Sequence, residues 1–168
     1  MTNKTIQLAQ LLGQNLQQNG WQVTCAESCT GGGIGYAITS ISGSSSWFKS
    51  GFITYANEAK QQLLGVLLTT LETYGAVSAQ TVQEMAQGAA AKAGAQLSIA
   101  VSGIAGPDGG SAQKPVGTVW FGFCVTGQIY SEKQLFRGDR QQIRVAAVDY
   151  ALLRGIEICQ QSQSKITA

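Results

Sequence analysis

The chain of 168 residues contains no histidine, and this absence restricts its chemistry more than any other feature of the composition. Histidine is the usual general base near neutral pH and the commonest metal ligand in proteins. A hydrolytic reaction catalysed by this chain would therefore need lysine, tyrosine or a carboxylate as its base. The sequence also lacks clustered carboxylates with the spacing of metal ligands, so we expect no bound metal and no cofactor.

Charge is scarce as well. Asp, Glu, Lys and Arg make up 12% of the residues, against about 25% in an average globular protein. The formal net charge of +2 is too small to indicate nucleic-acid binding. A weakly charged surface favours self-association, and we therefore expect a homodimer.

Two further absences concern the cellular setting. No apolar run is long enough to span a bilayer, and the polar N-terminal segment is unlike a signal peptide. The four cysteines form no CxxC pair and, without histidine, no zinc-binding pattern. We therefore expect a cytoplasmic protein with reduced thiols and no membrane partner.

The apolar residues recur with helical spacing in some segments and with strand-like spacing in others. This pattern predicts helices at 3–18, 32–40, 57–65, 78–93 and from 139 onward, and strands at 21–26, 48–55, 97–101, 116–126 and 129–136. Helices that alternate with strands favour an α/β fold. We predict a single domain over residues 1–168, a three-layer sandwich with a mixed β-sheet covered by helices.

The segment Glu27-Ser28-Cys29-Thr30-Gly31-Gly32 follows a predicted strand and opens a predicted helix. Its glycines permit positive φ, and its backbone N–H groups are free to bind an anion or an oxyanion. It matches neither the GxxxxGK[ST] phosphate loop nor the GxSxG elbow. The simpler interpretation is a tight turn in which Ser28 or Thr30 caps the helix.

Lys60 lies in the first turns of a short predicted helix, five residues after Tyr55. A lysine can act as a base for a serine hydroxyl if burial lowers its pKa. Tyr55 could then orient the transferred proton. On spacing alone, a solvated lysine and a tyrosine at the edge of the core are the better explanation of these residues.

Two other segments could bind a ligand. The glycine-rich loop at 102–110 follows a buried strand, where α/β proteins bind ligands, although a plain connector has the same composition. Arg140 and Arg144 share one face at the start of the last helix, which fits a monophosphate site. The alternative is a solvated face on which Asp139 and Asp149 pair with these arginines.

Six runs resemble the CinA C-terminal domain family of competence/damage-inducible proteins, which includes stand-alone nicotinamide mononucleotide deamidases. The runs are AESCTGG at 26–32, GFITYANEAK at 51–60, GAVS at 75–78, SGIAGPDGG at 102–110, KPVGTV at 114–119 and GDR at 138–140. The resemblance covers about residues 5–158 in the same order.

The resemblance implies an amidohydrolase of pyridine-nucleotide (NAD) salvage that converts nicotinamide mononucleotide to nicotinate mononucleotide and ammonia. It implies Ser28 as nucleophile, Lys60 as its base and Tyr55 as the residue that orients the proton. The substrate-binding residues that we expect are Glu27, Thr30, Gly31, Gly32, Gly103, Ala105, Gly106, Arg140 and Arg144. Two alternatives stay open: a catalytically inactive nucleotide-binding member of the family, and a hydrolase that uses Cys29.

Overall fold

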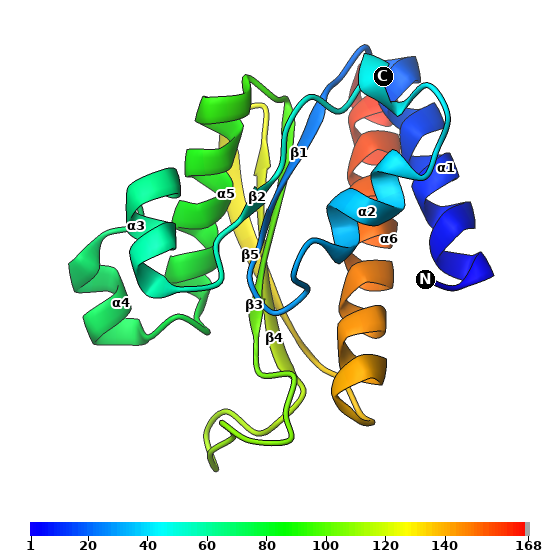
Figure 1. Cartoon of the computed structure of the whole chain (residues 1–168). Helices are drawn as coiled ribbons and strands as arrows, with labels where there is room; N and C mark the ends of the chain where they lie inside the picture. Colours follow the sequence, from blue (N-terminus) through cyan, green and yellow to red (C-terminus); the bar gives the residue numbers. More distant parts are fainter. Residues whose placement is uncertain (167–168) are drawn as a thin grey trace.

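The computed structural model describes residues 1–166 and has three layers around one five-stranded sheet (Figure 1). The strands lie in the order β2-β1-β3-β4-β5. They are β1 Val23–Glu27, β2 Phe52–Ile53, β3 Leu97–Gly103, β4 Thr118–Val125 and β5 Gln128–Leu135. β2, β1 and β3 are parallel, whereas β4 and β5 run antiparallel to their neighbours. The prediction of a three-layer α/β sandwich with a mixed sheet is confirmed.

Helices cover both faces of the sheet (Figure 1). On one face lie α1 Asn3–Asn19, α2 Gly33–Thr39 and α6 Arg140–Ile166, and on the other lie α3 Asn57–Leu64, α4 Leu68–Tyr74 and α5 Ala79–Ala93. A short 3-10 helix, η1, spans Ser44–Ser46. Each face has its own apolar core, and β3 between them is buried along almost its whole length, as expected for a strand covered on both sides.

Close packing against α5 fixes where α3 lies. A Cβ atom at Gly122 of β4 would come within 2.0 Å of the Val82 carbonyl oxygen on α5. One at Gly88 of α5 would come within 1.8 Å of the Leu64 carbonyl oxygen at the end of α3. Because glycine stands at both positions, α5 lies directly on the sheet and α3 lies directly on α5. Lys60 on α3 is thereby held near the end of β1.

The structure differs from the sequence prediction in two places. The strand expected at 48–55 shrinks to Phe52–Ile53, and Phe48 contributes only an isolated bridge to Val23. α4 was not expected, because its stabilising contacts are tertiary. Glu84 of α5 accepts hydrogen bonds from the Leu67 N–H at 2.8 Å and from the Thr70 hydroxyl at 2.6 Å.

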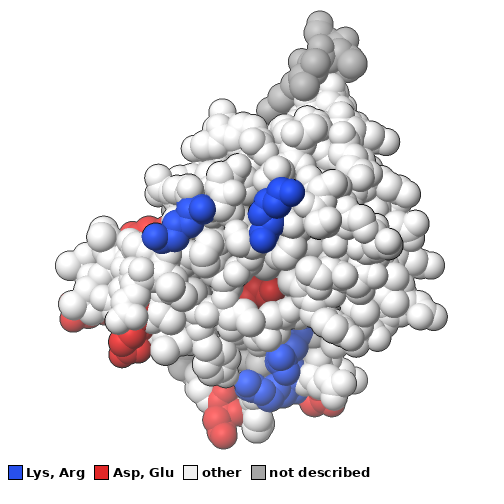
Figure 2. Space-filling model, turned by 45° about the horizontal axis from the view of Figure 1, so that its top comes forward, with Lys and Arg blue, Asp and Glu red and all other residues white. Residues whose placement is uncertain are grey.

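Charged side chains are sparse on the face shown in Figure 2, where blue and red groups stand apart on a mostly uncharged surface. Within residues 1–166, no helix combines the length and the apolar character needed to cross a bilayer. All four cysteines are buried and free.

Candidate active site

A cavity of about 200 Å³ lies where β1 and β3 end, and Asn57 and Lys60 of α3 are among the residues that line it. The carboxyl ends of parallel strands are the usual ligand site in open α/β sheets. Six residues predicted from the sequence line this cavity: Ser28, Tyr55, Lys60, Gly103, Ala105 and Arg140. The loops that follow the two strands therefore contribute to one site, although they are about 70 residues apart in the sequence.

Lys60 and Ser28 are in direct contact inside this cavity. The Nζ atom of Lys60 lies 3.1 Å from the Ser28 Oγ atom. It also donates to the main-chain carbonyl oxygens of Thr54, at 2.8 Å, and Tyr55, at 3.1 Å. The lysine side chain is 1% exposed and has no carboxylate within ion-pair distance among the described residues. Burial without a counter-ion disfavours the ammonium form and lowers the Lys60 pKa.

The turn after Ser28 has its carbonyl groups fully engaged. The Ser28 carbonyl accepts from the Gly31 N–H at 3.0 Å, and the Cys29 carbonyl accepts from Arg144 Nε at 3.0 Å. The Thr30 carbonyl accepts from the Gly33 N–H at 3.1 Å and from Arg144 Nη2 at 3.2 Å. The N–H groups of Cys29 and Thr30, in contrast, have no hydrogen bond to another residue within the described part of the chain. These two donors are free to bind an oxyanion.

Gly31 and Gly32 therefore have a different role from the one predicted. The Gly31 N–H closes the turn on Ser28, and the Gly32 N–H donates to Glu27 Oε2 at 3.1 Å. Both glycines have φ near the left-handed region, at 59° and 94°. They shape the turn, and their N–H groups are not free to bind a ligand.

Glu27 stabilises the start of α2 and does not face the cavity. Its carboxylate is 1% exposed and accepts N–H bonds from Gly32, Ile34 and Gly35 at 3.1, 3.0 and 2.8 Å. This corrects the expectation that Glu27 contacts the substrate, and neither Ser28 nor Thr30 caps α2 as the simpler interpretation had it. A carboxylate is favoured there by the partial positive charge of a helix N-terminus.

The main chain and the side-chain hydroxyl of Tyr55 bind two different residues. Its carbonyl oxygen binds Lys60, whereas its hydroxyl accepts from Arg140 Nη2 at 3.2 Å and its side chain is 62% exposed. The hydroxyl has no hydrogen bond to Ser28 or Lys60 among the described residues, so the structure does not support the expected proton-orienting role. Arg140 also donates through Nη1 to the Gly106 carbonyl oxygen at 2.8 Å. Arg140 thus connects the segment of Tyr55 with the loop at 102–110.

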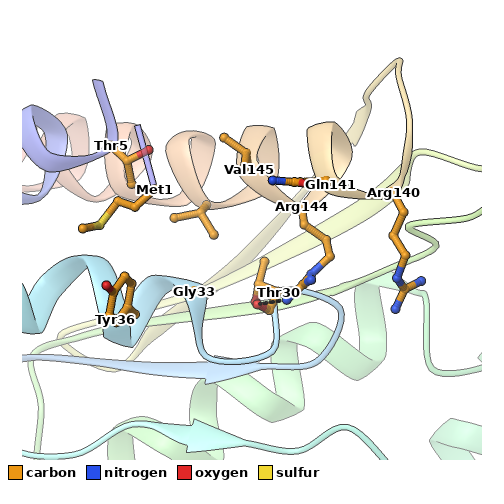
Figure 3. A pocket seen from close by; sticks show the side chains of 10 residues that line it. Met1, Thr5, Thr30, Gly33, Tyr36, Arg140, Gln141, Arg144 and Val145 are labelled. Atoms are coloured by element: carbon orange, nitrogen blue, oxygen red, sulfur yellow. Dashed lines mark hydrogen bonds between the residues drawn. The ribbon is translucent and has the colours of Figure 1, made fainter. Parts of the chain in front are cut away.

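A second cavity of about 380 Å³ lies beside the first, between α1, α2 and α6 (Figure 3). Arg140 lines both cavities, whereas Thr30 and Arg144 line only the second. In Figure 3 the Arg144 side chain extends from α6 to the Thr30 turn. The two arginines predicted to act together are thus separated: Arg140 stands at the mouth of the Ser28 cavity, and Arg144 supports the turn from behind.

Cys29 lines the Ser28 cavity, but its thiol is held in the protonated form. Burial raises the pKa of Cys29 to about 11. The sequence reasoning missed Ser102 and Asn57, which also line the cavity. A signal for Ser102 was present in the sequence, because it is a polar residue at the end of a predicted buried strand and the first residue of the loop at 102–110.

The model of the CinA C-terminal domain family matches residues 5–158. The chain belongs to this family. The nicotinamide-nucleotide amidohydrolase PncC of Enterobacter agglomerans is 59% identical over 142 residues, which are 84% of this chain and 87% of that protein. The PncC of Escherichia coli K12 is 51% identical over 89% of this chain and 92% of that protein.

A solved structure of the same family has the same fold. The competence/damage inducible protein CihA from Agrobacterium tumefaciens superposes with a TM-score of 0.91 at 42% sequence identity. The superposition covers 94% of this chain and 97% of that one.

Proposed function

We propose that this chain hydrolyses the carboxamide of nicotinamide mononucleotide, with Ser28 as the nucleophile and Lys60 as its base. The chain is an enzyme of the nicotinamide-nucleotide amidohydrolase type, because relatives with that name are 49–59% identical to it over most of their length. The observation that carries the proposed mechanism is the 3.1 Å contact between Lys60 Nζ and Ser28 Oγ in a buried cavity.

The three contacts of Lys60 fit a neutral amine. A neutral amine has two N–H donors and one lone pair. In the neutral form, the carbonyl oxygens of Thr54 and Tyr55 would accept the two N–H groups. The lone pair would then face the Ser28 hydroxyl across the 3.1 Å contact. The lowered pKa of Lys60 increases the fraction of this neutral form at a given pH.

The reaction would then proceed in two steps. Lys60 takes the proton of Ser28 as its oxygen forms a bond to the carboxamide carbon, and the carbonyl oxygen becomes an oxyanion that binds the N–H groups of Cys29 and Thr30. Lys60 returns the proton to the nitrogen, the C–N bond breaks, and ammonia leaves. A water molecule, deprotonated by Lys60, then attacks the acyl-serine. Lys60 returns this proton to the Ser28 oxygen as the ester C–O bond breaks, and nicotinate mononucleotide is released. A good oxyanion donor contributes about 3–4 kcal/mol to such a reaction.

Arg140 is the residue that we propose to bind the phosphate. Its guanidinium is at the mouth of the Ser28 cavity and also lines the second cavity. Two of its N–H groups bind Gly106 and Tyr55, and a guanidinium has five in all. The groups that stay free can donate to a phosphate at the outer end of a substrate whose carboxamide lies at Ser28. Gly103, Ala105 and Gly106 would form the wall on that side.

Two other functions are weaker alternatives. An inactive nucleotide-binding family member would have no need of a buried lysine without a counter-ion against a serine hydroxyl, because such a group destabilises the fold. A hydrolase that uses Cys29 would need a thiolate, and the raised pKa of Cys29 together with the absence of histidine opposes it.

We further propose that the enzyme acts in NAD salvage in the cytoplasm as a homodimer. The free, buried cysteines fit a reducing compartment. Exposed apolar side chains on and around α3 and α4, namely Leu63, Leu67, Leu68 and Tyr74, fit self-association. Sedimentation equilibrium of the purified protein would test the dimer, and a single species of monomer mass would contradict it.

Ammonia release from nicotinamide mononucleotide tests the proposed function directly. We expect the purified chain to form one equivalent each of ammonia and nicotinate mononucleotide. Ser28→Ala provides the control for contaminating amidases. Binding of the mononucleotide without any ammonia release by the wild-type chain would favour the inactive alternative.

A further inference from the structure

The hydroxyl of Ser102 opens into the Ser28 cavity and has no hydrogen-bond partner among the described protein atoms. The residue is 1% exposed, lines the cavity, and makes no side-chain hydrogen bond to any of residues 1–166. The hydroxyls of Thr30, Thr54 and Ser98 also lack partners but are fully enclosed by protein atoms. The Ser102 hydroxyl is the one of these four that a molecule in the Ser28 cavity can reach.

Ser102 lies beside the proposed nucleophile. β1 and β3 are parallel, and Glu27 is opposite Val101 in the last pair of the ladder. The Ser28 N–H donates to the Val101 carbonyl oxygen at 3.0 Å, which continues the pairing by one residue. Ser28 and Ser102 are therefore neighbours on adjacent strands, which lie about 4.8 Å apart. Ser28 and Ser102 each lie two residues after an alanine, Ala26 and Ala100, that packs into the core on the α5 side. Because residues two apart in a strand share a face, both side chains are on the Lys60 side of the sheet.

We propose that the Ser102 hydroxyl binds the nitrogen of the substrate carboxamide and so selects amides for this site. The inference rests on the proposed function. A carboxamide offers a carbonyl oxygen, which binds the N–H groups of Cys29 and Thr30, and an NH₂ group, which needs an acceptor. The Lys60 amine is already bonded to Ser28 and two carbonyls. The Ser102 oxygen accepts one N–H of the NH₂ group.

This contact orients the amide for both halves of its cleavage. With the oxygen held at the turn and the nitrogen held at Ser102, the carboxamide cannot rotate, and its carbon is presented to Ser28. When the C–N bond breaks, the nitrogen is next to Lys60, which supplies the proton that Ser28 had given up. Ser102 itself loses and gains no proton in this sequence.

An amide and an ester of the same acid distinguish binding of the amide nitrogen by Ser102 from an effect of Ser102 on acyl transfer in general. Nicotinamide mononucleotide and the methyl ester of nicotinate mononucleotide form the same acyl-serine, but the ester has no N–H to donate. We expect Ser102→Ala to lower kcat/KM for the amide by about 3- to 10-fold, the equivalent of one hydrogen bond, and to change kcat/KM for the ester less than 2-fold. Ser102→Thr keeps the hydroxyl and should retain most of the wild-type ratio of amide to ester hydrolysis.

Ser98→Ala is the matched control, because Ser98 is on the same strand with an enclosed hydroxyl outside the cavity. It should leave both reactions unchanged. Equal losses of kcat/KM on amide and ester in Ser102→Ala would overturn the proposal and assign Ser102 to a feature common to both acylation reactions. An unchanged amide rate would also overturn it. The proposed function fails separately, if the wild-type chain releases no ammonia from the mononucleotide.

Discussion

Arg144 donates a hydrogen bond from Nε to the main-chain carbonyl oxygen of Cys29, at 3.0 Å. In a trans peptide the C=O and the N–H point in opposite directions. The bond on the Cys29 carbonyl therefore fixes the direction of the Thr30 N–H, which belongs to the same peptide group and has no acceptor of its own within the described residues. Arg144 acts as a positioning residue for the proposed oxyanion site, whereas Arg140, one turn earlier on α6, faces the cavity mouth.

Substitution of Arg140 and of Arg144 should consequently change different kinetic constants. We expect Arg140→Ala to raise KM for nicotinamide mononucleotide on the order of 10-fold or more, because a charge-assisted hydrogen bond to phosphate is lost. KM for nicotinamide riboside, which has no phosphate, should change little. We expect Arg144→Ala to lower kcat on the order of 10-fold for both compounds with little change in KM. Steady-state kinetics on both substrates measures all four effects.

Arg144→Lys serves as the control for the positive charge, since lysine cannot reproduce the two bonds to Cys29 and Thr30. It should also have a reduced kcat. A rise in KM for the mononucleotide alone in Arg144→Ala would instead identify Arg144 as a phosphate ligand, as the sequence had indicated.

Cys29 should be dispensable for catalysis. Its pKa of about 11 leaves the thiol protonated near neutral pH, and its side chain is buried. We expect Cys29→Ala and Cys29→Ser to retain at least about a third of the wild-type kcat, since the space they change is one small buried group. If both variants fold but release no ammonia, Cys29 replaces Ser28 as the leading nucleophile.

Much of the fold could be predicted from the sequence because local signals and tertiary packing agree. Ser78 and Asp139 cap α5 and α6 at the residues where the sequence placed helix starts. α4 escaped prediction because it depends on Glu84, a residue on another helix. The strand at 48–55 was overestimated because side-chain alternation does not reveal how few of its residues find a partner strand.

The candidate site was predicted as a set of residues but not as an arrangement. The segments of Ser28, Lys60 and Arg140 could be found by motif, and the structure brings all three to one cavity. The direction of each side chain could not be found that way. Glu27 turns to the N–H groups of α2, and the Tyr55 hydroxyl turns to Arg140. Such directions depend on which face of the sheet a residue occupies and on partners far away in the sequence.

Glu27 should matter for stability and, through the turn, for rate. Its carboxylate accepts three N–H bonds at the start of α2. Glu27→Gln keeps the shape but replaces one oxygen by an NH₂ group and removes the charge, so we expect the free energy of unfolding to fall by about 1–3 kcal/mol. Urea denaturation measures this. Glu58→Gln, at an exposed position in the first turn of α3, should change it by less than about 0.5 kcal/mol.

The pH dependence should report on Lys60. Burial lowers its pKa below the ordinary lysine value of 10.5, so the neutral base is formed at lower pH than in an exposed lysine. We expect kcat/KM to rise with pH along one limb whose midpoint lies below 10.5. The residual activity of Lys60→Met should lack this limb. An identical limb in Lys60→Met would assign the titration to another group.

Ser28 and Lys60 should behave as one unit, because the only role of the lysine in the first step is to accept the serine proton. We expect Ser28→Ala and Lys60→Met each to lower kcat on the order of 1,000-fold or more, and the double variant to be about as slow as either single one, since groups that act together are strongly non-additive. Circular dichroism should show an unchanged fold.

Lys92→Met, at an exposed position in the last turn of α5, is the control for removal of a lysine and should keep wild-type activity. A Ser28→Ala variant that still deamidates at a near-normal rate would exclude the acyl-serine. Lys60 would then have to activate a water molecule directly, and the Lys60→Met substitution would remain damaging when Ser28 is absent.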